Sequence, residues 1–408
     1  MIKRKIINDP IYGFITVPDG IIFKLIEHPY FQRLRRIQQL GISSLVYPGA
    51  IHTRFHHAIG AMHLMQNAID TLLSKGIEIT DEESESAKIA ILLHDIGHGP
   101  FSHILEHSIV HGVTHENLSA LLMESLNKEF KGKLTQAIKI FRNQYKKKFL
   151  HQLVSSQLDV DRLDYLTRDT FFTGVSEGVI GYDRIIKMLT VANGNLVVEA
   201  KGIYSIEKFI IARRLMYWQV YLHKTVLAGM ELLVNILMRA KELADQKAEL
   251  FCTPAFREFL YNHYTKKDFK KNPELLETFA QLDDYDVLSS IKVWMNHEDK
   301  VLSTLCKWFI NRKLYSIKIQ KEPWTKKQVS GLQQIAKDKY NISTKEMKYF
   351  VFSYEVKSDI YNSHAVHINI LFPDGTITDF TKASDNLNTS VLDKVTRKYF
   401  VCYPKGMI

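Results

Sequence analysis

The feature that most constrains this chain is the stretch Ile89–His103, in which an apolar helix ends among side chains that can bind a metal. Thr80 and Glu83 have the spacing of a capping box, so we expect this helix to begin just after Thr80. The acidic residues at this start also suit the positive end of the helix dipole. The helix has to end near Gly97–Pro100, because glycine is poor in a helix interior and proline cannot continue one. The polar residues before this point therefore lie where a buried helix opens into a cleft.

Four metal-capable side chains occupy that end of the helix. His94 and Asp95 fall in its last turn, and His98 shares the face of His94 if the helix continues for one more turn. His103 follows the proline. Neutral imidazoles and carboxylates are ligands for divalent transition ions. A single histidine is more often a hydrogen-bonded core residue, but three histidines and one aspartate within ten residues favour a metal-binding cleft.

Two further helices carry residues of the same kind. His56 and His57 stand at the start of a helix expected over His57–Leu73. Neighbouring residues on a helix point about 100° apart, so we expect only one of the two to bind a metal, and the spacing leaves open which one. The acidic helix that contains Asp161 and Tyr165 on one face could supply a carboxylate that completes the site. Surface salt bridging is the alternative explanation of its charges.

A third segment places a histidine at a helix start. Thr114 is the expected N-cap of a helix over Leu118–Leu126, and His115 and Glu116 follow it. The positive end of the helix dipole disfavours protonation of His115, which suits an imidazole that acts as a base. A capping histidine on the surface is the alternative.

Composition limits the class of protein. The chain has 408 residues, of which 46% are hydrophobic and 24% charged, which is typical of a soluble globular protein. It has no apolar run of membrane-spanning length, and its first residues lack the apolar core that is typical of a signal peptide. Its three cysteines are widely spaced, so we expect a cytoplasmic protein without a signal peptide or a membrane partner. The net charge of +10 favours an anionic partner, either a nucleotide or a nucleic acid bound weakly.

The hydrophobic pattern predicts a mainly helical chain with a change of texture near residue 243. We expect helices over Ile21–Glu27 and Pro29–Gln39, a hairpin at Asn193-Gly194, and one long helix over Ile203–Lys241. Helices followed by β structure around a Pro373-Asp374-Gly375 turn are expected in the rest of the chain. We therefore divide the chain into residues 1–242 and a C-terminal α+β region, residues 243–408.

Several of these segments, taken in order, resemble a known family. The matching segments are Asn8–Gly13, Phe31–Gly41, Tyr47–Ala50, Thr53–Gly60, the His94-Asp95 stretch with Gly-His-Gly-Pro-Phe-Ser-His, His115-Glu116 and Leu158–Tyr165, and the likeness reaches about Lys224. Together they resemble the HD-domain phosphohydrolases, in particular the deoxynucleoside triphosphate triphosphohydrolases that include the SAM- and HD-domain-containing enzyme and its bacterial relatives. The resemblance implies an HD-domain helical fold with a smaller α+β C-terminal region.

The resemblance also implies roles for individual residues. It makes His57, His94, Asp95 and Asp161 the ligands of one divalent metal ion, whose identity (Mn, Mg, Fe, Zn, Co or Ni) stays open. It places His98, His103 and His115 around the α-phosphate and assigns the proton transfers to His103 or His115, with Glu116 or Glu106 as support. It matches Arg54, Arg162, Tyr165 and Arg213 to positions that hold the triphosphate. It matches Gln39, Leu40, Asp169 and Tyr221 to positions around the sugar, and Lys224 to a further substrate position.

The expected activity is hydrolysis of deoxynucleoside triphosphates to deoxynucleoside and inorganic triphosphate, by a homo-oligomer that is a dimer or a tetramer. One alternative is an HD phosphohydrolase that acts on another nucleotide, such as a monophosphate or a signalling nucleotide. Another is a nucleic-acid-binding protein with little turnover, whose affinity would depend strongly on salt.

Overall fold

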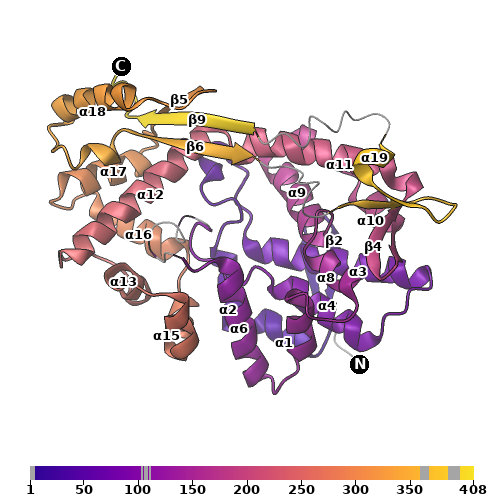
Figure 1. The fold of residues 1–408 in the computed structure, drawn as a ribbon. Helices are drawn as coiled ribbons and strands as arrows, with labels where there is room; N and C mark the ends of the chain where they lie inside the picture. The colour runs from indigo at the N-terminus through magenta and orange to yellow at the C-terminus, as the bar shows by residue number, and fades with distance from the viewer. Residues whose placement is uncertain (1–4, 103, 105–108, 110–111, 359–366, 385–395) are drawn as a thin grey trace.

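The structure is a computed structural model that describes residues 5–102, 104, 109, 112–358, 367–384 and 396–408. It is mainly helical, with a smaller strand-containing C-terminal region, as expected (Figure 1). The helices of the N-terminal part are α1 (Ile21–Glu27), α2 (Pro29–Gln32), α3 (Arg54–Ser74), α4 (Asp81–Leu93), α6 (His115–Glu129), α7 (Thr135–Phe141), α8 (Lys148–Val154), α9 (Val160–Thr173) and α10 (Tyr182–Met188).

The remaining helices follow in the second half of the chain. They are α11 (Ile203–Met216), α12 (Lys224–Asp245), α13 (Pro254–Tyr261), α14 (Lys266–Lys271), α15 (Pro273–Phe279), α16 (Asp284–Trp294), α17 (Lys300–Ile310), α18 (Lys326–Tyr340) and α19 (Phe380–Ala383). Helix α12 contacts α13 and α17 and the strand β5, so it supports most of the C-terminal region (Figure 1).

The strands form three small sheets. The strands are β1 (Lys5–Asp9), β2 (Gly13–Val17), β3 (Leu189–Ala192), β4 (Asn195–Glu199), β5 (Ser316–Gln320), β6 (Phe352–Ser358), β7 (Asn369–Leu371), β8 (Ile377–Asp379) and β9 (Thr396–Tyr403). β1 and β2 form an antiparallel hairpin, and β5, β9 and β6 form an antiparallel sheet in that order. The hairpin expected at Asn193-Gly194 is confirmed as β3 and β4.

The C-terminal region adds two strands to the sheet of β3 and β4. Strand β7 pairs in parallel with β4 and antiparallel with β8, and the Pro373-Asp374-Gly375 turn joins β7 to β8 as expected. Figure 1 shows β4 and α19 on the side of the molecule opposite to α13–α18. The chain thus returns to the N-terminal part after building the C-terminal helices. The proposed division at residues 242 and 243 falls inside α12 and stays a prediction.

The helix expected over Pro29–Gln39 is shorter than predicted. Helix α2 ends at Gln32, a 3-10 turn covers Arg33–Arg36, and Ile37 is extended. The extended backbone lets Ile37 O accept a hydrogen bond from Arg54 N (2.9 Å), and it pairs Gln38 with Thr53. Contacts with the start of α3 therefore override the local helical pattern.

The single helix expected over Ile203–Lys241 is wrong, because the helix is interrupted. A π-helical turn occupies Tyr217–Tyr221, and α12 starts anew after His223, whose side chain caps it by accepting a hydrogen bond from Thr225 N. The wider turn places Tyr221, whose hydroxyl donates to Asp169 Oδ2 at 2.7 Å. Such π turns inside helices occur frequently at functional sites.

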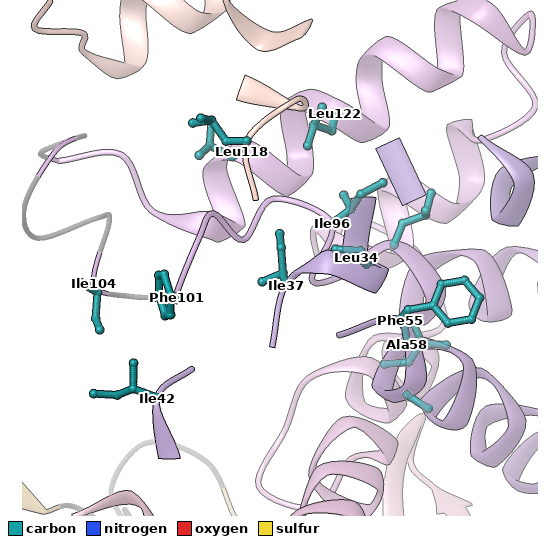
Figure 2. Packing of buried hydrophobic residues seen from close by; sticks show 14 of the residues in the cluster. Leu34, Ile37, Ile42, Phe55, Ala58, Ile96, Phe101, Ile104, Leu118 and Leu122 are labelled. Atoms are coloured by element: carbon teal, nitrogen blue, oxygen red, sulfur yellow. The ribbon is translucent and has the colours of Figure 1, made fainter. Parts of the chain in front are cut away.

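Helix α4 begins as its sequence predicts. Thr80 is the N-cap. Its hydroxyl oxygen accepts a hydrogen bond from Glu83 N, and the Glu83 carboxylate accepts one from Thr80 N. Apolar residues of α4 then pack against α3, and the loop after α4 continues the same core. Figure 2 shows part of this cluster, with Leu34, Ile37, Phe55, Ala58, Ile96, Phe101, Leu118 and Leu122. The core thus reaches up to the loop that carries the candidate site.

No single helix in the part of the chain that the structure describes is long and apolar enough to cross a membrane. The segments 200–221 and 224–245, bent by 54° at the break between them, meet the length and composition requirements only as a pair.

Two glycines inside helices give a test of the packing. A Cβ atom at Gly60 in α3 would overlap the side chains of Asp164 and Arg168, whereas one at Gly331 in α18 would meet nothing within 4 Å. We expect Gly331→Ala to raise the free energy of unfolding by about 0.5–1 kcal/mol, because alanine is the better helix former. We expect Gly60→Ala to lower it by about 1–3 kcal/mol through overpacking.

Chemical denaturation of the two variants beside the unsubstituted protein measures both effects. An equal stabilisation by both substitutions would contradict the close packing of α3 against α9.

Candidate metal centre

Three donor atoms, from α3, from α9 and from His94 directly after α4, converge at one point. His57 Nε2 from α3 lies 3.1 Å from Asp161 Oδ1 of α9 and 3.4 Å from His94 Nε2, and His94 Nε2 lies 3.4 Å from Asp161 Oδ1. Donors that share one ion at about 2.1 Å lie roughly 3.0–3.4 Å from each other. The residues present therefore fit a divalent ion in both spacing and chemistry.

Asp95 stands at the edge of this group. Its Oδ1 lies 3.3 Å from His94 Nε2, and its Oδ2 lies 3.9 Å from His57 Nε2. Arg54 donates from Nη1 to Asp95 Oδ2, and His98 Nε2 lies 3.4 Å from Asp95 Oδ1. Asp95 thus faces both the three-donor group and a second group formed with His98 and His115.

Hydrogen bonds behind the donors set their orientation. His57 Nδ1 donates to Asp164 Oδ2 at 2.7 Å, and His94 Nδ1 donates to Ile91 O at 2.6 Å. With the proton on Nδ1, each Nε2 presents its lone pair to the centre, as in histidines that bind metals. Asp164 in turn accepts from Nε and Nη2 of Arg168, each at 3.0 Å, and Arg168 reaches Asp9 in β1 at 2.9 Å.

The charges of the group favour a bound cation. Burial opposes a charge on His57, but its hydrogen bonds to Asp161 and Asp164 outweigh that effect and raise its pKa to about 10. Burial likewise opposes the charge of Asp161, and yet the two imidazoles hold the pKa of that carboxyl well below its usual range. A pocket that stabilises positive charge in this way also suits a metal ion, which takes the place of the protons.

The second group contains the histidines expected to face the phosphate. The rings of His98 and His115 stack with their centroids 3.9 Å apart. Burial and then Arg54 lower the pKa of His98 well below its usual value, which keeps this imidazole neutral. Glu116 approaches His115 Nε2 only to 3.6 Å, beyond normal hydrogen-bond length, and its side chain is 66% exposed. His103 and Glu106 lie outside the described residues.

Local sequence explains how α6 brings His115 to this place. Thr114 caps the helix as predicted, and its hydroxyl accepts from Asn117 N. A Cβ atom at Gly97 would overlap the backbone of His115 and Ser119, so glycine lets the loop after α4 lie directly on the first turn of α6. Gly97 N donates to Ser119 Oγ at 2.9 Å and fixes that approach.

The residues expected to hold the triphosphate lie around Asp161. Arg162 pairs with Asp159, and Arg213 Nη1 donates to Gln157 Oε1 at 2.9 Å. Burial raises the pKa of Tyr165 to about 12, against the opposing effect of Arg213 and Arg162, which both lie close enough to act on its hydroxyl. Arg54, the fourth member, is buried and also donates to Ser102 Oγ at 2.7 Å.

The residues expected around the sugar form a second wall. Asp169 is buried and accepts from both His52 Nε2 (2.8 Å) and Tyr221. Gln39 N donates to His52 O at 3.0 Å, and Leu40 next to it is half-buried. Lys224 differs from the rest, because it is exposed at the first residue of α12.

Sequence reasoning missed the residues that hold the others in place. Asp164 lies three residues after Asp161 and Arg168 four residues after Asp164, so helical spacing could have placed them on the same face of α9. His52 precedes the predicted helix, and no local pattern connects it to Asp169, which follows 117 residues later.

Two known domain families match parts of this chain. Residues 54–169 match the HD domain, and residues 180–251 match the HD associated region. The crystal structure of a phosphohydrolase from Bacteroides thetaiotaomicron superposes with a TM-score of 0.96 at 53% sequence identity, over 99% of this chain and 100% of that one.

Two relatives known from their sequences extend the comparison. The uncharacterized protein YwfO of Bacillus subtilis is 35% identical over 320 residues, 77% of this chain and 71% of that protein. A Dictyostelium discoideum protein named as a homolog of the deoxynucleoside triphosphate triphosphohydrolase SAMHD1 is 33% identical over 241 residues, 54% of this chain and 46% of that protein.

Substitutions on α9 test the metal centre. We expect Asp161→Asn to abolish tight binding of Mn²⁺, because it removes a charged donor. We expect Asp164→Asn to weaken binding about 10- to 100-fold, because the amide supports His57 less well. Asp159→Asn is the matched control, since asparagine caps a helix as well as aspartate does and the substitution leaves the three donors in place.

Isothermal titration calorimetry with Mn²⁺ gives the affinities, and circular dichroism checks that each variant is folded. Equal affinities for all three variants would contradict a metal site at Asp161.

Proposed function

Because this chain belongs to the HD-domain phosphohydrolase family, we propose that it hydrolyses deoxynucleoside triphosphates at the α-phosphorus, releasing deoxynucleoside and inorganic triphosphate. The observation that carries the proposal is the set of cationic side chains beside the three-donor group. Arg54 contacts Asp95, and Arg162 follows Asp161 directly in the chain. Arg213 lies close enough to Tyr165 for its charge to oppose the rise in the pKa of that hydroxyl. A triphosphate needs several such cations at once, because its charge must be held while one bridge breaks. A monophosphate would need fewer.

The proposed ligands of the ion are His57, His94, Asp95 and Asp161. A divalent ion in such a site polarises a phosphoryl oxygen and makes bound water more acidic. Asp164 and Ile91 O keep the two imidazoles oriented with Nε2 forward. The identity of the ion is left open, because nitrogen and oxygen donors suit several transition metals.

His115 or His103 is proposed to transfer the proton, with His98 beside them at the α-phosphate. Burial lowers the pKa of His98 and leaves this imidazole neutral, and His115 stands in the first turn of α6 with its ring stacked on that of His98. A neutral imidazole within reach of the phosphate can donate a hydrogen bond to it or accept a proton from the attacking water. His103 belongs to the same proposal, and Glu116 is its most exposed member.

The sugar is proposed to lie against Asp169, Tyr221, Gln39 and Leu40, with Lys224 at the outer edge. Tyr221 and His52 fix the Asp169 carboxylate, so this wall is rigid before substrate arrives. The named activity of the Dictyostelium relative supports the same substrate class. A homo-oligomeric state and a cytoplasmic location stay predictions from the sequence.

Product analysis tests the proposal. Protein loaded with Mn²⁺ or Mg²⁺ is incubated with each of the four deoxynucleoside triphosphates, and the products are separated by anion exchange. We expect deoxynucleoside and tripolyphosphate, and we expect Asp161→Asn to lose this activity.

Other products would identify another function. Pyrophosphate or orthophosphate would move the attack to a different phosphorus. Turnover of only monophosphates or signalling nucleotides would favour another HD phosphohydrolase. Salt-sensitive binding of oligonucleotides without any turnover would favour a nucleic-acid-binding protein.

A further inference from the structure

We propose that Asp284, in the C-terminal region, is a positioning residue that holds two walls of the active site in register. It stands at the first position of α16, far from the metal-binding residues in the sequence. The inference rests on the proposed function for its effect on turnover, while its structural part is independent of the substrate.

Both carboxylate oxygens of Asp284 bind backbone amides of the active-site walls. Phe101 N donates to Oδ1 at 2.8 Å, and Gln38 N donates to Oδ2 at 2.8 Å. The side chain lies between the loop after α4 and the extended segment before α3, and Asp284 is only 4% exposed. One carboxylate thus joins two segments that are separated by more than sixty residues in the chain.

The first bond holds a loop in an unusual conformation. Phe101 and Ser102 both have positive φ angles, 52° and 59°, a region that side chains other than glycine rarely adopt. In this conformation Ser102 Oγ accepts from Arg54 Nη2, and the other end of the guanidinium reaches Asp95. The hydrogen bond to the Phe101 amide therefore supports Ser102, the next residue, which contacts the proposed phosphate-binding Arg54.

The second bond holds the opposite wall. Gln38 pairs with Thr53. On either side of it, Ile37 O accepts a hydrogen bond from Arg54 N, and Gln39 N donates one to His52 O. This segment sets the backbone position of Arg54 and supports His52, which fixes Asp169. The two arms of Asp284 therefore converge on Arg54 from its side chain and from its backbone.

The residues before Asp284 reinforce the same junction. Arg33 is fully buried and donates from Nη1 to Leu282 O at 3.0 Å and from Nη2 to Ile96 O at 2.7 Å. Asp283 pairs with Arg36. Three consecutive residues, Leu282, Asp283 and Asp284, thus all take part in holding this junction together.

Asp284 is not required to start its own helix. Asp283 is the N-cap of α16, and its side chain accepts a hydrogen bond from Tyr285 N. The Asp286 carboxylate accepts one from Asp283 N, which completes the capping box. Burial raises the pKa of Asp284 to about 6, although the two amides and Arg54 oppose this. A carboxyl that is costly to bury and is not the N-cap is explained by the amides it binds.

Hydrogen–deuterium exchange tests the structural part directly. Asp284→Asn has nearly the same shape but only one acceptor oxygen, so at least one of the two amides loses its partner. In the metal-loaded protein we expect faster exchange in peptides covering residues 36–40 or 97–102, or both. Asp286→Asn is the matched control, because it weakens the capping box of α16 without touching these walls, and its exchange there should equal that of the unsubstituted protein.

Turnover tests the positioning role. We expect kcat to fall about 10- to 100-fold in Asp284→Asn, as for a misplacement of about 1 Å in a catalytic site, and to stay unchanged in Asp286→Asn. Ser102→Ala removes the next link to Arg54, so the double variant Asp284→Asn/Ser102→Ala should lose little more than the worse single variant. Fully multiplicative losses, or unchanged exchange and kcat in Asp284→Asn, would overturn the inference.

A second substrate separates this inference from the proposed function. The same variants are assayed with bis(4-nitrophenyl) phosphate, which needs no triphosphate or sugar recognition. If the unsubstituted protein hydrolyses the diester but no deoxynucleoside triphosphate, the proposed substrate is wrong, while a loss in Asp284→Asn with the diester still supports the positioning role. If Asp284→Asn melts far below Asp286→Asn, a further variant is needed, and Asp284→Glu keeps both acceptor oxygens. Slow amide exchange restored in Asp284→Glu supports the inference. Exchange as fast as in Asp284→Asn refutes it.

Discussion

The buried contact between Asp164 and His57 is the interaction on which the rest of the site depends. It fixes the proton on Nδ1 of His57 and so aims Nε2 at the other donors. Asp164 is itself held by Arg168, which is tied to Asp9 in the N-terminal hairpin. Breaking a buried pair of this kind leaves an uncompensated charge and costs about 3–5 kcal/mol. The network therefore links the position of a proposed metal ligand to the stability of the N-terminal part, and it explains why only glycine fits at position 60.

The loop after α4 is held from two directions. Gly97 brings it onto the first turn of α6, where His98 and His115 stack, and Asp284 binds its far end from the C-terminal region. The apolar side chains of Ile96 and Phe101 anchor the same loop in the core (Figure 2). A loop that carries candidate catalytic residues thus has little freedom, as expected where side chains must be placed before substrate binds.

Local sequence patterns predicted those parts of the site that depend on contacts between residues close together in the chain. The capping box at Thr80 and the cap at Thr114 follow from the backbone requirements of helix ends, and both lie where expected, whereas α4 ends at Leu93, before the glycines that were expected to end it. The break at Gln32 and the π turn at Tyr217–Tyr221 were not predicted, because contacts with Thr53 and Asp169 decide them. For the same reason Asp284 gave no signal, since its partners lie 183 and 246 residues away in the chain. The resemblance to a family supplied the choice of His57 over His56, and His57 is the one that reaches the three-donor group.

We propose that His57, His94, Asp95 and Asp161 hold one metal ion beside a bound triphosphate. A crystal structure of the protein with Mn²⁺ and a non-hydrolysable deoxynucleoside triphosphate analogue tests this, with anomalous scattering to locate the metal. We expect one strong peak among these four side chains, with the α-phosphate between it and the stacked pair of His98 and His115. A metal bound only by Asp95, His98 and His115, or a triphosphate held away from Arg54 and Arg162, would contradict it.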